Sequence, residues 1–342
     1  MKLKFNNEKP LILDGGMGQT LLKQGMISQG TLWSASALLD GSLHQMVINA
    51  HQEFMKAGAK VITTNNFTVR KLRFSENNIL DKFEEAMHTA GRLAKQAKQE
   101  NTFFRDVHIA GSVPTRNQTY MANFELSKDQ VLHEFQLTGN ILNEYVDFFY
   151  LDALTSIEEI EIALKALSHL DKKILIGAHV KKNGLLADGN NIESLKSIID
   201  QYNIFGVIVA CTDQPTVLSV IEEIQRLGVP FGFKINAFAN IPEGWKMNPG
   251  SNPIDSLGIN KNFNEENFIS FAEFQVLVLP KLRDDNLNRL ILRQLVRNIY
   301  VALALHTLSK LSSMGHNQQL RGIEVDRHQE LVMDHGSDVQ VI

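Results

Sequence analysis

Three polar side chains of this sequence stand where a short apolar segment gives way to a polar one, and their types could do chemistry. Asp14 closes "LILD", Asp152 closes "DFFYLD" and Cys211 closes "GVIVAC". Two carboxylates can act as acid and base, and a thiol can bind a metal ion. Gly15 and Gly16 follow Asp14 and allow the backbone to approach a small ligand there.

The glycine-rich stretch at residues 15–18, "GGMG", does not have the pattern of a nucleotide-binding loop. The spacing G-x-G-x-x-G is absent, and no Gly-Lys-Ser/Thr follows. Two interpretations remain open. The stretch is either a simple turn, or the rim of an active site in which the glycines keep side chains away from Asp14.

These residues lie far apart in the chain, so a scaffold must bring them together. Short apolar runs alternate with helix-length segments, which is typical of parallel strands buried on both faces. We expect strands at residues 11–14, 60–65, 107–112, 147–152, 173–180, 206–211, 230–236 and 274–280. Helices are expected between them, at 42–59, 156–170 and 215–228 among others. Repeated strand–helix units favour an α/β fold, a (β/α)8 TIM barrel with an atypical last strand, over an open doubly wound sheet.

In such a barrel the functional residues lie where strands end. Besides Asp14, Asp152 and Cys211, the predicted strand ends carry Thr63, Thr64, Asn65, Ser112, Pro114, His179 and Asn236. We expect these side chains to surround one mouth. His179, and His108 within a strand, are candidate metal ligands, although a single strand histidine more often packs in the core.

The sequence divides at the end of the predicted barrel, residues 1–280. Residues 281–312 contain one long amphipathic helix, at 287–311, which either packs on the barrel or binds a partner. Residues 313–342 have no clear period and are expected to form a flexible tail. The net charge of −4 gives no support to nucleic-acid or membrane binding. We expect a cytoplasmic protein, since no signal peptide or membrane span is visible.

Five segments in order resemble the motifs of the homocysteine S-methyltransferase family: "LILDGGMGQTL" (11–21), "LWSASAL" (32–38), "AGAKVITTNNF" (57–67), "IAGSVP" (109–114) and "VACTDQP" (209–215). This family includes betaine–homocysteine methyltransferase and the homocysteine module of cobalamin-dependent methionine synthase. The resemblance runs from about residue 11 to about residue 245. It implies a (β/α)8 barrel, methyl transfer from a donor to a thiol amino acid, and a role in methionine biosynthesis.

The resemblance also implies roles for individual residues. Asp14, with Gly15 and Gly16, matches the family's substrate-binding aspartate and its neighbours, and Asp152 matches a glutamate that binds the substrate amino group. The family holds zinc with three cysteines. Cys211 matches the first of them, although Ala210 replaces the usual asparagine. The other two come from a cysteine pair after the last strand, and Cys211 is the single cysteine of this chain.

Three hypotheses follow. The first is a methyltransferase acting on a thiol such as homocysteine, with zinc expected from the family but with an incomplete zinc site. The second is a degenerate relative, a pseudoenzyme, that binds a small amino acid without zinc-dependent methyl transfer. The third, an unrelated barrel enzyme with Asp14 and Asp152 as acid and base, is disfavoured by the five matching segments. The sequence leaves the methyl donor and the oligomeric state open.

Overall fold

The computed structural model describes residues 11–100, 105–236, 238, 241–251, 253 and 257, together with the backbone of 273–278. The predicted C-terminal helix within 281–312 and the predicted tail, 313–342, lie outside the described residues. Their boundaries therefore stay predictions.

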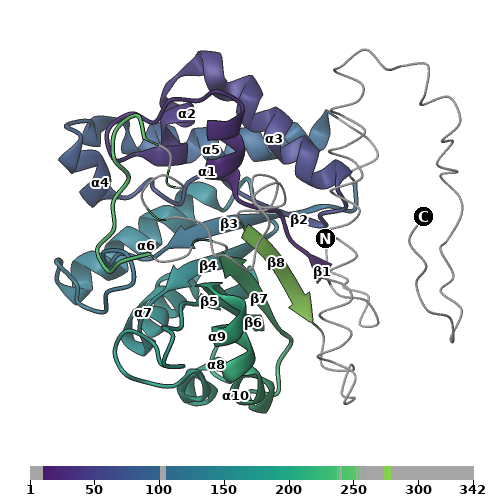
Figure 1. Ribbon diagram of the computed structural model, residues 1–342, viewed down its shortest axis with the longest axis vertical. Helices are drawn as coiled ribbons and strands as arrows, with labels where there is room; N and C mark the ends of the chain where they lie inside the picture. The colour runs from purple at the N-terminus through teal and green to yellow at the C-terminus, as the bar shows by residue number, and fades with distance from the viewer. Residues whose placement is uncertain are drawn as a thin grey trace, which may run out of the picture.

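A curled, eight-stranded and mostly parallel sheet forms the centre of the molecule (Figure 1). Its strands are β1 (Leu11–Ile12), β2 (Val61–Thr63), β3 (His108–Pro114), β4 (Phe148–Leu154), β5 (Ile174–Ala178), β6 (Ile204–Thr212), β7 (Phe231–Asn236) and β8 (Glu273–Val278). Neighbouring strands follow the order β1-β8-β7-β6-β5-β4-β3-β2. Every predicted strand is present, and β2 to β7 pair in parallel as expected.

The last strand differs from its counterparts in direction. β8 pairs antiparallel with β7, where Phe231 faces Val278, and antiparallel with β1, where Leu11 faces Leu277. Eight parallel strands, the arrangement of an ideal (β/α)8 barrel, are therefore not what this sheet contains. The prediction of an atypical last strand agrees with this pairing.

The two ends of the sheet also approach each other. Leu13 forms an isolated parallel bridge with Val61, and the Lys60 amide donates to the Ile12 carbonyl at 2.8 Å. We refer to this β1–β2 contact as the seam. The seam is short because β1 extends over only two residues.

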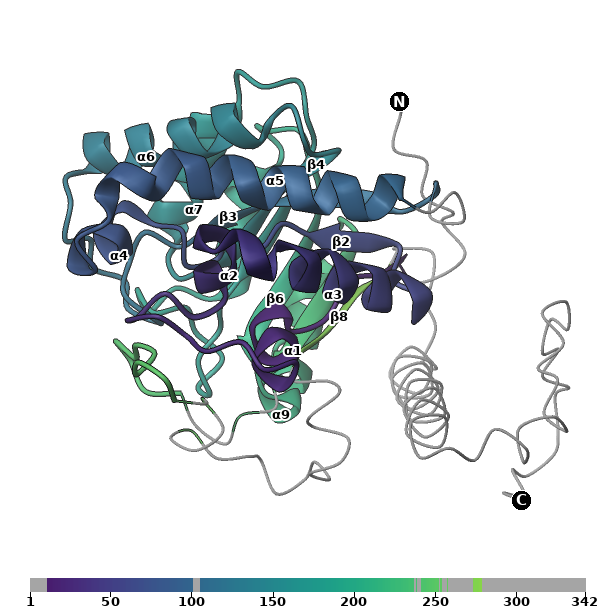
Figure 2. The same ribbon diagram turned by 90° about the horizontal axis from the view of Figure 1, so that it is seen from above.

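Helices surround the outer face of the curled sheet (Figure 1). The longer α-helices are α1 (Met17–Lys23), α3 (His44–Lys56), α5 (Phe83–Gln99), α6 (Lys128–Leu142) and α7 (Ile157–Leu167). The shorter ones are α2 (Ser36–Leu39), α4 (Lys71–Glu76), α8 (Lys196–Ile199), α9 (Gln214–Ser219) and α10 (Ile221–Arg226). Helices α3 and α5 lie side by side (Figure 2), and so do α6 and α7.

Helix boundaries follow local signals in part. Ser156 caps α7 by accepting from the Glu159 amide at 3.2 Å, as its position predicts. The Glu159 side chain, however, does not complete a capping box; it accepts instead from Thr115, Arg116 and Thr155. The single helix predicted over 215–228 is two helices, α9 and α10, which meet at Val220.

The apolar core has two parts. The larger one lies between the sheet and the helices. The smaller one fills the inside of the curled sheet and contains Leu13, Val61, Ala110, Phe148, Tyr150, Leu175, Phe205 and Ile208. Successive strand residues face opposite sides, so residues two positions beyond this inner cluster also face inward. The inner cluster therefore forms a floor beneath the carboxyl ends of the strands.

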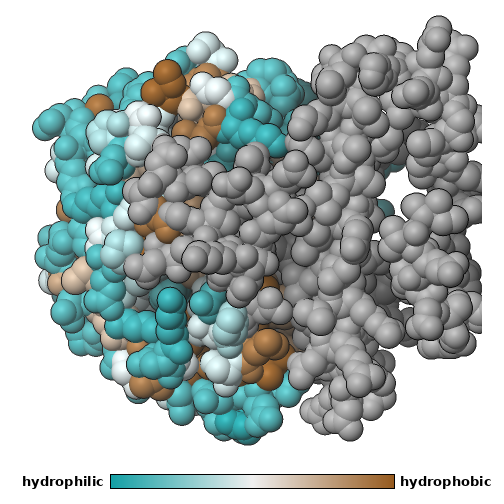
Figure 3. All heavy atoms as spheres, in the orientation of Figure 1, coloured by the Kyte–Doolittle hydropathy of each residue, from teal (hydrophilic) through white to brown (hydrophobic). Residues whose placement is uncertain are grey.

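The described surface is mostly hydrophilic on the face shown in Figure 3, with apolar side chains in small, separate groups. The exposed large apolar residues are Ile27, Leu80 and Leu218. Within the described part of the chain, no helix has the length and apolar character needed to cross a membrane.

Candidate active site

One pocket opens at the carboxyl ends of the strands, with about 1120 Å³ of space that includes part of the open solvent. It collects most of the predicted strand-end residues. Those that line it are Asp14, Gly15, Gly16, Thr63, Thr64, Asn65, Asp152, Cys211 and Asn236. Ser112, Pro114 and His179 do not line it, although all three are buried.

Asp14 is held in place by the neighbouring strand β2. Its carboxylate accepts from the Thr63 amide at 2.6 Å and from the Thr63 hydroxyl at 2.8 Å. Burial raises the pKa of Asp14 from an ordinary 3.8 to about 7, because desolvation outweighs these hydrogen bonds and the charge of Lys234. Asp14 is thus a buried carboxyl group that changes its charge near neutral pH.

Asp152 lies on β4, two residues beyond Tyr150 of the floor. Its carboxylate accepts from the Ser112 hydroxyl at 2.9 Å and from the Lys234 ammonium at 3.3 Å. Both members of the Asp152–Lys234 ion pair are buried. The Lys234 ammonium also lies 5.9 Å from the centre of the Tyr150 ring. The carboxylate predicted to bind an amino group therefore already has a cationic neighbour.

Two irregularities of the backbone occur next to the predicted site residues. The register of β4 shifts between Leu151 and Leu154, and that of β6 shifts between Ala210 and Thr212. At these bulges Ala153 and Cys211 have φ of 58° and 56°, a left-handed conformation that costs energy for residues with a Cβ. Bulges of this kind redirect side chains beside active sites.

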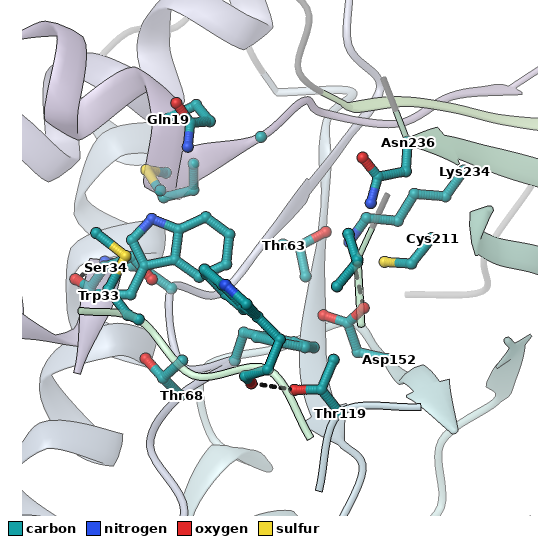
Figure 4. Close-up of a pocket in the computed structure, with 18 of the residues that line it drawn as sticks. Gln19, Trp33, Ser34, Thr63, Thr68, Thr119, Asp152, Cys211, Lys234 and Asn236 are labelled. Atoms are coloured by element: carbon teal, nitrogen blue, oxygen red, sulfur yellow. Dashed lines mark hydrogen bonds and ion pairs between the residues drawn. The ribbon is translucent and has the colours of Figure 1, made fainter. Parts of the chain in front are cut away.

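The bulge in β6 explains the position of the thiol. Val207 and Val209 belong to the outer core, so in a regular strand Cys211 would point outward as well. With the bulge, Cys211 lines the pocket instead. Figure 4 shows its side chain next to that of Lys234.

The bulge of β6 is supported by His179, which lies behind the pocket lining, and by Tyr120, which lines the pocket. The Tyr120 hydroxyl donates to the Cys211 carbonyl at 3.2 Å, and His179 Nδ1 lies 3.1 Å from the Ala210 carbonyl. The two rings stack with centroids 3.6 Å apart. Burial lowers the pKa of His179 to about 4, so the ring is neutral at pH 7. His179 therefore packs against the strand end, which is the structural role considered for it.

The opposite wall of the pocket is aromatic (Figure 4). Trp33 and Trp245 meet edge to face, with ring centroids 5.9 Å apart. A Cβ atom at Gly18 would lie 2.4 Å from Trp33 Nε1, so only glycine fits against this indole. Gln19 Nε2 and Trp33 Nε1 are buried and have no hydrogen-bond partner among the described residues. These two donors can serve acceptor atoms of a ligand.

Sequence reasoning did not identify Lys234 or the aromatic wall. A signal for Lys234 exists, because a single lysine within the apolar strand "PFGFKIN" must be paired when it is buried. The contact between Trp33 and Trp245 joins residues that are far apart in sequence, and no local pattern predicts it.

Comparison with known proteins agrees with this geometry. A family model described as homocysteine S-methyltransferase matches residues 11–258, most of the chain. The chain belongs to this family. Homocysteine S-methyltransferase 2 of Saccharomyces cerevisiae is 22% identical over 218 residues, which is 58% of this chain and 65% of the yeast protein. The match thus spans somewhat less than two thirds of that relative.

A second member of the family, homocysteine S-methyltransferase YbgG of Bacillus subtilis, is 21% identical over 233 residues, covering 63% of this chain and 73% of that protein. A solved structure, the homocysteine methyltransferase MmuM from Escherichia coli in its metallated form, has a TM-score of 0.61 at 17% identity. The superposition covers 67% of this chain and 85% of that one, and it supports the α/β fold.

The residues present do not fit the three-cysteine zinc centre that the family resemblance implies. Cys211 is the single cysteine of the chain. Among the described residues, no three His, Cys, Asp or Glu side chains are grouped so as to hold a metal ion. The two pocket carboxylates already accept from Thr63, Ser112 and Lys234. Among the side chains that the structure describes, none therefore joins Cys211 in a group that could form a tetrahedral centre with an open position.

Proposed function

We propose that this member of the homocysteine S-methyltransferase family transfers a methyl group to the thiol of a small amino acid such as homocysteine. The observation that carries the proposal is the convergence of Asp14, Asp152 and Cys211 on one pocket. Asp14 follows β1, Asp152 lies on β4, and Cys211 lies on β6. By the resemblance described above, Asp14 and Asp152 match substrate-binding residues of the family, and Cys211 matches the first of its zinc-binding cysteines.

In this proposal the carboxylates bind the amino acid, and the glycines give it room. A substrate ammonium group is attracted by the carboxylate of Asp152 and by that of Asp14 in its ionised form, and both carboxylates line the pocket. Gly15 and Gly16 line the pocket beside Asp14 and present no bulky side chain. The substrate thiol then extends toward Cys211 and the carboxyl ends of β6 and β7.

The aromatic wall suits a methyl donor of the onium class, in which the methyl group is attached to a positively charged sulfur or nitrogen atom. Cations bind over the faces of tryptophan rings, and Trp33 and Trp245 both line the pocket. In the reaction the substrate thiol releases its proton to the solvent, and a lone pair of its sulfur attacks the methyl carbon. The bond from the donor atom to the methyl group breaks, and its electron pair leaves with the donor, which becomes neutral.

We also propose that the full domain, residues 1–280, is a modified (β/α)8 barrel. The strand order and the seam between Leu13 and Val61 support closure of the sheet, while β8 departs from the ideal by its direction. Residues 281–312 and 313–342 are proposed to follow the barrel as a helix and a tail.

A second candidate, a relative that binds a small amino acid without methyl transfer, is favoured by the single cysteine. Two measurements distinguish the candidates. Isothermal calorimetry measures the binding of homocysteine, and mass spectrometry measures methionine formed from homocysteine and a sulfonium or quaternary ammonium donor. Homocysteine binding together with methionine formation supports the methyltransferase, and binding alone supports the second candidate.

The variant Asp14→Ala tests the proposed binding mode. A hydrogen bond to a charged group contributes about 1.5–3 kcal/mol, so affinity for homocysteine is expected to fall about 10- to 100-fold. Asp171→Ala, at an exposed aspartate, is the matched control and is expected to bind as the wild type does. Unchanged affinity in Asp14→Ala would contradict the proposed site.

A further inference from the structure

Lys234 is an unusual residue for the inside of a curled sheet. Its side chain is 7% exposed, and it lies on β7 between two residues of the outer core, Phe233 and Ile235. A charge in such a place is costly unless it is paired. Asp152 provides the pairing at 3.3 Å, and the Tyr150 ring lies beneath the ammonium group. Lys234 is therefore a fixed positive charge on the floor of the pocket.

The sheet register places this charge next to the thiol site. Ala210 pairs with Lys234 and Thr212 pairs with Ile235, and Cys211 is the bulged residue between those two pairs. In the view of Figure 4 the side chains of Cys211 and Lys234 extend into the pocket in the same direction, next to each other, with Asp152 and Asn236 beside them. A substrate sulfur that approaches Cys211 therefore also approaches Lys234.

A positive charge is what a thiol needs in order to ionise. A thiol has an ordinary pKa of about 8.5, so only a few per cent is thiolate at neutral pH. Lysine next to a sulfur atom stabilises the thiolate, as a bound metal does. The partners for a three-cysteine metal centre are absent from this chain, and a metal cation at Cys211 would be repelled by the neighbouring ammonium group.

We propose that Lys234 supplies the positive charge that holds the substrate sulfur as a thiolate, in place of a metal ion. The inference rests on the proposed function, because it takes a thiol amino acid as the ligand. On binding, the S–H bond breaks, its electron pair stays on sulfur, and the proton passes to the buffer. The thiolate then lies between Lys234 and the methyl donor.

The test counts protons released on binding to metal-free protein. The protein is treated with a chelator, its metal content is measured, and calorimetric titrations at pH 7 are run in buffers of different ionisation enthalpy. Homocysteine and methionine are the two ligands. They carry the same amino and carboxylate groups, so any change in the protonation of Asp14 or Asp152 cancels in their difference. Only homocysteine has a thiol to ionise.

We expect homocysteine to release close to one proton more than methionine. In Lys234→Met this difference is expected to fall toward zero, and in Lys234→Arg, which keeps the charge, it is expected to persist. Circular dichroism checks that each variant is folded. The wild-type measurement alone can overturn the proposal, so the test does not depend on the stability of the variants.

Three outcomes would overturn the inference. The first is that metal-free wild type shows no proton difference between the two ligands, or shows one only after Zn²⁺ is added. The second is that the difference is unchanged in folded Lys234→Met. The third is that neither amino acid binds the wild type, which would overturn the proposed function as well. Binding without a proton difference overturns this inference alone.

Discussion

The pocket wall opposite the aromatic wall is formed by the carboxyl ends of the strands, and it has two halves, one at β1–β4 and one at β6–β7. The two halves hold their polar side chains in different ways. On the β1–β4 half, Asp14 and Asp152 accept hydrogen bonds from Thr63 and Ser112, short side chains of adjacent strands. On the β6–β7 half, Cys211 depends on a backbone bulge, and Lys234 depends on an ion pair with Asp152. Side-chain hydrogen bonds between adjacent strands thus hold the first pair, whereas a backbone bulge and an ion pair hold the second. Under the proposed function, the first pair binds the amino acid and the second receives its thiol.

The largest effect is expected from the titration of Asp14 on the first half. Because its pKa rises from 3.8 to about 7 on folding, the folded state binds this proton more tightly than the unfolded state. The stabilisation of the folded state by protonated Asp14 is fully present below about pH 4 and is lost as the pH rises to about 7. The loss is at most about 4 kcal/mol, at 1.36 kcal/mol per pKa unit.

Urea unfolding of wild type and Asp14→Asn at pH 4, 5.5, 7 and 8 checks this expectation. Asparagine does not titrate, so the difference in unfolding free energy between the two proteins isolates Asp14. A difference that does not change with pH would show that folding does not shift the pKa of Asp14.

The next effect concerns the support of the first half. The Glu159 carboxylate accepts from the Arg116 amide at 2.6 Å, the Thr155 amide at 3.0 Å and the Thr115 hydroxyl at 2.9 Å, and so joins the segments that follow β3 and β4. Glu159→Gln replaces one acceptor oxygen by a donor that faces these groups. We expect a loss of about 2–3 kcal/mol in unfolding free energy.

Glu158→Gln is the control for that variant on the same helix. Glu158 is exposed and pairs with the exposed Lys128, so the expected change is below about 1 kcal/mol. Equal losses in the two variants would mean that the network around Glu159 does not support the site.

The third effect concerns the aromatic wall, which belongs to neither half. Gly18→Ala places a methyl group where the Trp33 indole lies, at 2.4 Å in the present geometry. The ring must move, at an expected cost of about 1–3 kcal/mol. Chemical denaturation measures the cost. Gly41→Ala is the control because a Cβ there meets nothing within 4 Å. If Gly18→Ala is as stable as the control, Trp33 has room to shift.

The smallest effect is expected on the second half. Tyr120→Phe removes the hydroxyl that donates to the Cys211 carbonyl but keeps the ring stacked on His179. One neutral hydrogen bond contributes about 0.5–1.5 kcal/mol, so the unfolding free energy is expected to fall by about 1 kcal/mol. Reaction of Cys211 with a thiol reagent should become faster. An unchanged rate would show that the bulge holds Cys211 without this bond.

The sequence was sufficient to predict the strands and most strand-end residues, since apolar runs and their polar ends are local features. The reversed direction of β8 was not predictable, because the apolar pattern of a strand is the same in both directions. The bulges at Ala153 and Cys211 were missed because their left-handed backbone has no glycine to mark it. Lys234 was missed because the ion pair that allows its burial is made with Asp152, which lies on another strand.

Asp14 also has a structural role at the seam, and this role bears on the evolution of the chain. β1 and β2 meet through the Leu13–Val61 bridge and the Lys60–Ile12 hydrogen bond, and the Asp14 carboxylate adds two bonds to Thr63 at the same place. A single side chain thus lines the pocket and ties the first strand to the second. If Asp14 binds the substrate as proposed, natural selection acts on this position twice, once for binding and once for folding. A lineage that lost the methyl-transfer reaction would still have reason to keep this aspartate.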